Sequence, residues 1–203
     1  MRLALSPTRL RWQTSDAIAQ VARLDSLVDN ILDSVRAGTP DIAVRRTRFD
    51  LRAAVAASLR ELAPLLRGHR LGAPRAGAAL WVAGDRRRTA EVVGGLVHNA
   101  TKYAPPGTRI AVRIGRERGR GVVRVADEGR GVPPNERDRI FDPFVRAVDV
   151  PAPGTGIGLY ASRRLVEAQG GELWYEDPPR AAGARRSRGA VFAFSVPVWR
   201  ARA

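Results

Sequence analysis

The sequence predicts an α+β fold, a two-layer sandwich with helices covering one face of an antiparallel or mixed sheet. Short apolar runs on either side of a glycine-containing turn predict a hairpin of strands at 109–115 and 121–126. Two later apolar runs predict closing strands at 172–176 and 190–196. Helical periodicity marks three segments that precede or separate these strands: 51–67, 85–104 and 156–168.

The N-terminal segment predicts a separate helix. Thr14 to Asp16 offer N-cap groups, and Gly38 and Pro40 end the pattern. Between them, apolar residues recur at alternating spacings of three and four: Val21, Leu24, Val28, Ile31 and Val35. Such a seam indicates a partner helix, which predicts a homo- or heterodimer through residues 15–36. Packing against the chain's own globular body is the alternative.

The region before the first motif is harder to assign. Residues 39–47 are interpreted as a linker. Asp50 is a candidate N-cap for the helix at 51–67, and Pro64 is expected to kink or shorten it. Residues 68–79, rich in Gly, Ala and Pro, receive no element, and a strand is expected at 79–82.

Two later segments are expected to be loops. Residues 128–153 are rich in Gly, Pro and charge, which indicates a long functional connection with at most short helices. Gly170 and Gly171 end the last helix. A basic, poorly structured excursion is expected at 178–189.

The chain is strongly basic, with a formal net charge of +15 and Lys102 as its only lysine. This charge fits either binding to nucleic acid or acidic lipid, or an Arg-rich composition combined with a phosphate ligand. The arginines are spread along the chain, without a helix-turn-helix or RNA-binding pattern, which favours the second interpretation and no specific nucleic acid. The absence of cysteine excludes disulfides, thiolate catalysis and Cys-based zinc sites.

No stretch of the sequence approaches the roughly 18 consecutive apolar residues of a membrane span. Met1 to Leu10 lack the apolar core and cleavage site of a signal peptide. A cytoplasmic location is therefore expected, with any membrane association arising through a partner or a missing N-terminal region.

The first chemical motif lies late in the helix at 85–104. Asn99, Lys102 and Tyr103 stand at i, i+3 and i+4 and share one helix face. An Asn side-chain oxygen suits Mg²⁺, a lysine ammonium neutralises phosphate, and a tyrosine ring can cover part of a nucleotide. A solvent-facing polar helix face is the alternative.

The second motif, Asp127 to Gly131, directly follows a predicted strand. A carboxylate at a strand end can accept a hydrogen bond from an exocyclic amine such as that of adenine. Gly129 and Gly131 let the backbone approach a flat ring or take positive φ. An ordinary turn is the alternative for such a pattern.

The third motif opens the helix at 156–168 and consists of Gly154, Thr155, Gly156, Ile157, Gly158 and Leu159. Glycines at a helix start expose backbone N–H groups that favour phosphate. No Gly-Lys-Ser/Thr follows, so this is not a Walker loop. Before it, Phe141 and Phe144 lie in a polar loop, where they anchor either a lid or the loop's own packing.

Taken together, these motifs resemble the four boxes of the histidine-kinase ATPase domain, a branch of the superfamily that also holds DNA gyrase B and MutL. The resemblance covers about 45–198, and the segment from Arg23 to Asp33 is similar to the second helix of the dimerisation and phosphotransfer hairpin. It implies a Bergerat-type ATP-binding fold. The implied organisation is a partial dimerisation helix at 1–38, the linker, and a catalytic domain at 48–198.

The resemblance also implies ligands and roles. Asn99 would hold Mg²⁺, Asp127 would bind the adenine amine, and Lys102 and Arg146 would contact phosphate. The remaining implied nucleotide-binding residues are Tyr103, Gly129, Gly131, Phe141, Phe144, Gly154, Thr155, Gly156, Gly158 and Leu159. No catalytic side chain is identified beyond this ATP site.

Two departures from the family pattern affect the transfer step. Gly95 stands where these families usually carry Asn or an acidic residue. Neither His69 nor His98 has the sequence context of the family's phosphoacceptor histidine, and residues 1–14 contain no histidine. The resemblance therefore implies that the acceptor lies on another chain or on a missing segment.

Three functions are compatible with these observations. The first is the ATP-binding catalytic module of a two-component sensor histidine kinase, with a histidine-containing partner or kinase half and a response regulator as partners. The second is a nucleotide-binding regulatory or degenerate kinase that dimerises without phosphotransfer. The third is a basic DNA-binding or gyrase-like ATPase.

Overall fold

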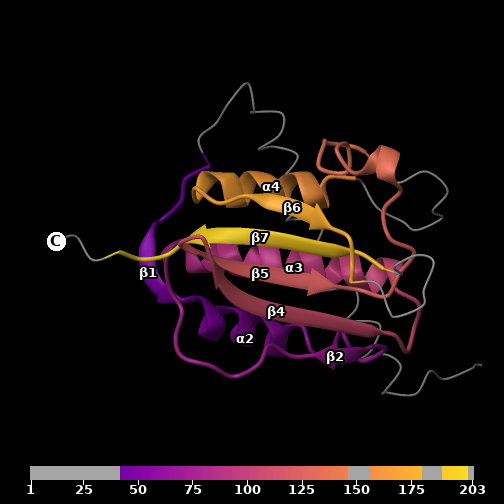
Figure 1. Cartoon of the computed structure of the whole chain (residues 1–203), viewed down its shortest axis with the longest axis horizontal. Coiled ribbons are helices and arrows are strands. Elements are labelled where there is room, and N and C mark those ends of the chain that lie inside the picture. The colour runs from indigo at the N-terminus through magenta and orange to yellow at the C-terminus, as the bar shows by residue number, and fades with distance from the viewer. Residues whose placement is uncertain (1–41, 146–155, 180–188, 201–203) are drawn as a thin grey trace, which may run out of the picture. The chain divides into compact units, whose positions relative to one another are not determined.

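A five-stranded mixed sheet forms the centre of the computed structural model, which describes residues 42–145, 156–179 and 189–200 (Figure 1). Its strand order is β2-β4-β5-β7-β6. β2 runs parallel to β4, and the other neighbouring strands are antiparallel. The strands are β2 (Arg70–Gly72), β4 (Arg109–Glu117), β5 (Arg120–Ala126), β7 (Val191–Pro197) and β6 (Leu173–Glu176).

Three helices cover one face of this sheet (Figure 1): α2 (Leu51–Glu61), α3 (Arg86–Tyr103) and α4 (Gly158–Ala168). The α+β sandwich and its mixed sheet are thus confirmed. A second, two-stranded antiparallel sheet joins β1 (Thr47–Asp50) to β3 (Trp81–Gly84). A single bridge between Val82 and Val198 connects it to the chain just after β7.

The β4–β5 hairpin turns over two residues that both take positive φ, Arg118 at 47° and Gly119 at 76°. Two consecutive positive φ angles are typical of the tight turns whose twist matches that of paired strands. The turn fixes the register, with Glu117 opposite Arg120 and Val112 opposite Val125. Because side chains alternate along a strand, this register directs one apolar set of β4 and β5 toward the helices.

The core lies between the helices and the inner face of the sheet. From α3 it receives four side chains with no exposed surface: Val92, Val93, Leu96 and Val97. From β7 it receives Phe192 and Phe194, which are 4% and 0% exposed. Burying one such aliphatic or aromatic side chain contributes about 1.5–3 kcal/mol, so α3 is held mainly by its packing against the sheet.

A buried glutamine joins the start of α3 to the end of α4. Gln169 is 1% exposed. Its Oε1 accepts hydrogen bonds from the backbone N–H of Asp85 at 2.9 Å and from the Thr89 hydroxyl at 3.1 Å, and its Nε2 donates to the Leu165 carbonyl at 2.9 Å. Asp85 in turn caps α3 by accepting from the N–H groups of Arg87 and Arg88. Gln169, at the end of α4, thus fixes the position of Asp85, the residue that caps α3.

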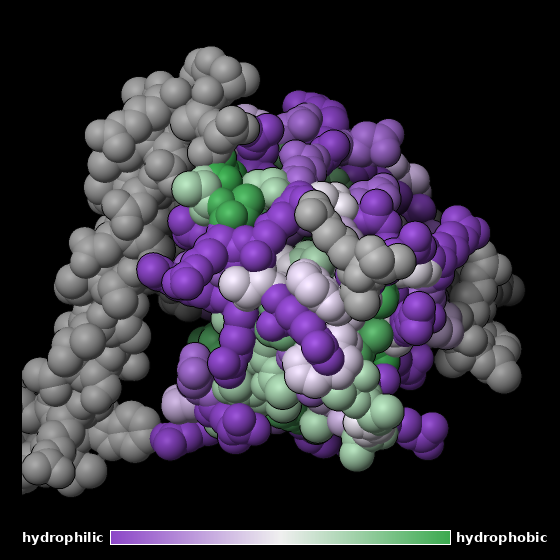
Figure 2. All heavy atoms as spheres, turned by 90° about the vertical axis from the view of Figure 1, so that its left-hand side faces the viewer, coloured by the Kyte–Doolittle hydropathy of each residue, from purple (hydrophilic) through white to green (hydrophobic). Residues whose placement is uncertain are grey.

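The face of the domain around β1 presents mostly hydrophilic side chains with apolar areas between them (Figure 2). Two exposed tryptophans, Trp81 and Trp199, are joined through their backbones, because the backbone N–H of Trp199 donates to the Trp81 carbonyl at 3.0 Å. The Arg48 guanidinium lies 4.2 Å from the centre of the Trp81 ring, where a cation–π contact covers part of the indole. Among the described residues, no helix has the length and apolar character needed to cross a membrane.

Most expected elements are confirmed, and several boundaries are corrected. The helix expected at 51–67 ends at Glu61 and is followed by turns, because Pro64 has no N–H to donate to the Arg60 carbonyl. The strand expected at 79–82 is β3, which begins at Trp81. β1 and β2 were not predicted, and Thr47, expected to end the linker, is the first residue of β1.

The expected loop at 128–153 is confirmed as far as it is described, with one 3₁₀ turn, η1 (Pro134–Glu136). The helix and dimer expected through residues 15–36 lie outside the described residues, as does most of the basic excursion at 178–189. The domain boundaries at 38 and 48 therefore stay predictions.

Two neighbouring glycines in α3 give a matched stability test. A Cβ on Gly94 would meet nothing within 4 Å, whereas a Cβ on Gly95 would lie 2.9 Å from the Ser162 hydroxyl of α4. Glycine inside a helix costs about 0.5–1 kcal/mol relative to alanine. We expect Gly94→Ala to raise the free energy of unfolding by about that amount, and Gly95→Ala to raise it less or to lower it. Urea denaturation measures both changes, and equal gains would contradict the close contact between α3 and α4.

Candidate functional site

The first two motifs meet where the end of α3 touches the loop after β5. Gly129 lies against the last residue of α3, so closely that a Cβ on Gly129 would be 2.6 Å from the Tyr103 carbonyl oxygen. A side chain at position 129 would therefore push the loop away from the helix. The glycine is needed for this contact, which brings the motif at 127–131 against the motif at 99–103.

The polar face of α3 is formed by Asn99, Lys102 and Tyr103, all partly exposed. The Lys102 ammonium lies 4.9 Å from the centre of the Tyr103 ring. Within the described residues, the Asn99 side chain makes no hydrogen bond. The structure thus places an amide, a cation and an aromatic ring together at the end of the helix that borders the second motif.

Asp127 is the buried polar group at the centre of this region, with 6% of its surface exposed. Its Oδ1 accepts from the backbone N–H of Gly129 at 2.8 Å and of Ala190 at 3.3 Å. Neither of these bonds uses Oδ2. Burial raises the pKa of the Asp127 carboxyl above its ordinary value, although the two backbone N–H groups act in the opposite direction. The site thus holds a buried carboxylate whose orientation is set by two backbone N–H groups on one oxygen.

The second glycine of the motif fits against the start of β7. Gly131 has a φ of +77°, and a Cβ there would lie 2.7 Å from the Gly189 carbonyl oxygen. Gly189 itself has a φ of +99°, and its backbone lies against the Asp127 carbonyl with no room for a Cβ. The backbone N–H of Asp127 also donates to the Ala190 carbonyl at 2.9 Å. Gly189 and Ala190 therefore fix the backbone of the second motif through close packing and hydrogen bonds.

The contacts of Gly189 and Ala190 with the second motif were not predicted from the sequence, because Gly189 was assigned to the basic, poorly structured excursion at 178–189 and Ala190 to the start of a strand. The available signal was a glycine directly before an apolar strand. That signal becomes informative only when the β5–β7 pairing is known, since the pairing places Ala126 opposite Val191.

The phenylalanines of the loop after the second motif behave differently from each other. Phe141 is 7% exposed and packs edge-on against Phe192 of β7, with ring centres 6.3 Å apart. Phe144 is 67% exposed and has a φ of +64°, in the left-handed region. Gly156 lies directly against its backbone, because a Cβ on Gly156 would be 2.8 Å from the Phe144 carbonyl carbon. Phe141 thus anchors the loop, and Phe144 projects from it.

The third motif is only partly described. Gly158 is the first residue of α4 and is exposed, and Leu159 packs against the core. Gly154 and Thr155 lie outside the described residues, as does Arg146. The structure therefore places Gly156 against the phenylalanine loop, Gly158 at the exposed start of α4 and Leu159 against the core, and it does not test the rest of the motif.

The residues fit a metal ion held mainly by a ligand's phosphates. Within the described residues, no group of three or more acidic or histidine side chains could hold a metal by itself. Mg²⁺ usually keeps several waters and takes few protein ligands beside phosphate oxygens. The Asn99 amide oxygen suits such a position, because the residue is partly exposed and its side chain makes no hydrogen bond with another described residue.

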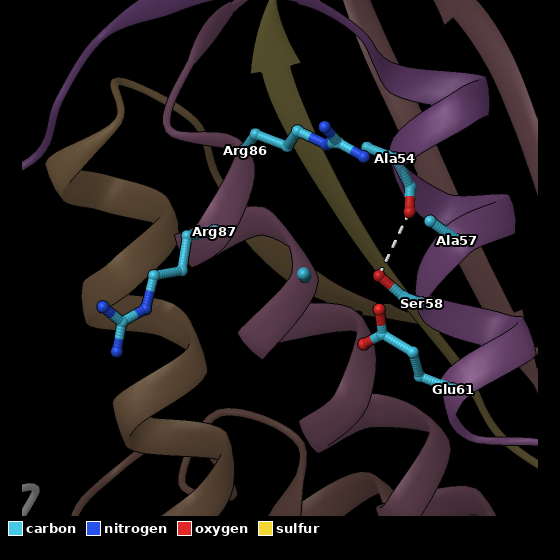
Figure 3. A pocket seen from close by; sticks show the side chains of 7 residues that line it. Ala54, Ala57, Ser58, Glu61, Arg86 and Arg87 are labelled. Carbon is cyan, nitrogen blue, oxygen red and sulfur yellow. Dashed lines mark hydrogen bonds between the residues drawn. The ribbon is translucent and has the colours of Figure 1, made fainter.

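A separate hollow of about 330 Å³ lies between α2 and the start of α3 (Figure 3). It is lined by three alanines together with Ser58, Glu61, Arg86 and Arg87. Arg87 and Asn99 are twelve residues apart in one helix, which is roughly 18 Å along its axis. The hollow is therefore distinct from the region where the motifs meet.

Comparison with known proteins agrees with this arrangement. The family described as histidine kinase-, DNA gyrase B-, and HSP90-like ATPase matches residues 84–200. The adaptive-response sensory kinase SasA of Synechococcus sp. (strain JA-2-3B'a(2-13)) is 32% identical over 187 residues, which are 89% of this chain and 47% of SasA. The chain therefore spans about half the length of this curated relative.

Solved structures of sensor histidine kinases align with this chain. The mycobacterial sensor histidine kinase MprB aligns with a TM-score of 0.64 and 26% identity, over 76% of this chain and 98% of that one. Full-length ShkA, in complex with AMPPNP, aligns with a TM-score of 0.71 and 26% identity, over 100% of this chain and 41% of that one.

The burial of Asp127 predicts a stability cost that depends on pH. Because its pKa is raised in the folded state, the ionised carboxylate destabilises the fold above that pKa, and the penalty disappears as pH falls and the group is protonated. Asp127→Asn keeps an oxygen for the Gly129 and Ala190 N–H groups without the charge. We expect the variant to be more stable than the wild type near neutral pH, with a difference that shrinks toward about pH 4. Urea unfolding across this pH range measures it, and a constant difference would contradict the raised pKa.

Proposed function

This chain belongs to the histidine kinase-, DNA gyrase B- and HSP90-like ATPase family, and from that premise we propose that it supplies the γ-phosphoryl transfer of a two-component sensor histidine kinase. Its ATPase domain is related to those of sensor histidine kinases. The proposal goes further than this relationship, because it assigns a reaction, an acceptor and the residues of the site. It includes a cytoplasmic location for the domain.

The observation that carries the proposal is the fixed carboxylate of Asp127. An adenine amine is a hydrogen-bond donor, and a carboxylate whose Oδ1 is already held by two backbone N–H groups offers it Oδ2. A charge-assisted bond in a buried site is both strong and selective. In this proposal Asp127 binds the adenine amine, and Gly129 and Gly131 keep side chains out of the space for the ring.

The polar face of α3 is assigned to the phosphate end of the nucleotide. Lys102 neutralises phosphate charge, Tyr103 lines the nucleotide, and Asn99 would hold Mg²⁺ against the phosphates. When bound, Mg²⁺ would neutralise charge on the transferred group. Arg146 and the remaining glycines of the third motif, Gly154 to Gly158, belong to this end in the proposal, together with Thr155, Leu159, Phe141 and Phe144.

The acceptor of the phosphoryl group is proposed to be a histidine other than His69 and His98. His69 lies just before β2, and its buried Nδ1 has no hydrogen-bond partner among the residues that the structure describes. His98 lies inside α3, next to Asn99. Neither has the sequence context of the family's phosphoacceptor histidine, in which an acidic residue follows the histidine directly. A histidine-containing partner and a response regulator are therefore part of the proposal.

Gly95 supports a second candidate, a nucleotide-binding regulatory module without transfer. It stands one helical turn before Asn99, on the same face of α3, and is exposed. A carboxylate or amide there could take part in the reaction, and glycine offers neither. In this alternative the site binds ATP, and the partner histidine is not phosphorylated.

Nucleotide binding is expected to depend on two named residues. We expect Asp127→Asn to weaken ATP binding by about 10- to 100-fold, because a charge-assisted bond is lost. Asn99→Ala should weaken ATP binding in the presence of Mg²⁺ more than in its absence. Isothermal titration calorimetry measures both, with Glu61→Gln and Glu172→Ala as exposed controls outside the motifs and outside the loop 132–145. Wild-type affinity in both site variants would refute the assignment of the site.

Phosphotransfer separates the two candidate functions. With labelled ATP and a histidine-containing helical hairpin from a sensor kinase, the first candidate predicts label on the hairpin, lost with Asn99→Ala. The regulatory candidate predicts ATP binding without label. Gly95→Glu places a carboxylate one turn before Asn99, and faster labelling in this variant would show that the missing carboxylate limits transfer.

A further inference from the structure

An arginine and an aspartate outside the sequence motifs connect the loop after the second motif to the sheet. Arg137 directly follows η1 and Asp177 directly follows β6. The guanidinium bonds to both carboxylate oxygens, with Nη2 to Oδ1 at 2.6 Å and Nη1 to Oδ2 at 3.0 Å. A bidentate pair of this kind fixes orientation as well as distance.

The same guanidinium makes further contacts. Its Cζ lies 5.0 Å from the centre of the Tyr175 ring, and the Tyr175 hydroxyl donates to Asp177 Oδ1 at 3.2 Å. Its Nε also points at the Val132 carbonyl, at 3.4 Å. An exposed ion pair alone contributes little to folding stability. In this pair the Arg137 side chain is 33% exposed and the Asp177 side chain is 55% exposed. The stacking on Tyr175 and the contact with Val132 give it a defined position that an isolated pair lacks.

These contacts continue into the strand that supports Asp127. Tyr175 packs edge-on against Phe192, with ring centres 5.9 Å apart, and Phe192 packs against Phe141 of the loop. The Arg163 guanidinium of α4 also lies 5.9 Å from the centre of the Phe141 ring. The loop is thus attached to β6 by Arg137 and to β7 by Phe141, while Asp127 is attached to β7 separately through Ala190.

We propose that Arg137 and Asp177 form a latch that positions the loop 132–145 for the phosphate end of the nucleotide, without contributing to adenine binding. The proposal rests on the function proposed above. The loop begins after Gly131, carries Phe141 and Phe144, and leads directly to Arg146. Losing the latch leaves the Gly129 and Ala190 bonds to Asp127 in place and frees the middle of the loop.

The latch therefore predicts different effects on two ligands. Arg137→Ala and Asp177→Ala should each weaken ATP binding by about three- to tenfold, as expected for an ion pair reinforced by stacking. Their affinity for adenosine should be little changed, because adenosine reaches only the Asp127 end. The charge-swapped pair, Arg137→Asp with Asp177→Arg, should recover part of the ATP affinity that Arg137→Asp alone loses.

The experiment is calorimetric titration of ATP and adenosine into the whole chain, with Arg87→Ala as the control. Arg87 also forms an exposed ion pair, with Glu91 at 3.2 Å, at the opposite end of α3 from Asn99. Amide hydrogen exchange of 132–145 in the nucleotide-free protein should be faster in Arg137→Ala and unchanged in Arg87→Ala.

The outcomes separate the two proposals. If the wild type binds ATP and Arg137→Ala binds it equally well, the latch is wrong and the proposed function stands. If ATP and adenosine weaken together, the pair acts on the whole fold, and the latch is again wrong. If the wild type binds no ATP, the proposed function fails and the latch fails with it.

Discussion

The attachment of Asp127 to the first residues of β7 is the contact on which the geometry of the site depends. The carboxylate accepts from Ala190, the backbone of Asp127 donates to Ala190, and Gly189 allows the two segments to approach. A motif at the end of β5 is therefore completed by residues some sixty positions later. Since β7 pairs with both β5 and β6, the site requires the assembled sheet.

Two buried polar groups illustrate different uses of hydrogen bonding. Gln169 bonds through both its oxygen and its nitrogen and serves to join α3 to α4. Asp127 is a charged group with its two bonds on the same oxygen, and its burial opposes ionisation. The buried carboxylate of Asp127 destabilises the free protein, but it can accept a hydrogen bond from a ligand. Such a residue is expected at a position where ligand binding, and not folding stability, determines the choice of amino acid.

The β4–β5 hairpin and helix α3 could be predicted from the sequence, because the residues that determine them are close together in the chain. The turn at Arg118–Gly119 and the cap at Asp85 act within a few residues. β1 and β2 were missed, since four and three residues carry little periodic signal and gain their pairing from distant partners. The order of the motifs predicted the site residues, but the close approach of Gly129 to Tyr103 and of Gly189 to Asp127 depends on packing that only the structure provides.

The central claim, that Asp127 recognises the adenine amine of ATP, is tested most directly by comparing ATP with inosine triphosphate. The two nucleotides share ribose and phosphates, but inosine carries a carbonyl oxygen where adenine carries the amine. A carboxylate facing that oxygen would meet an acceptor, so we predict that inosine triphosphate binds at least about tenfold more weakly than ATP. Equal affinity for the two nucleotides would contradict the account.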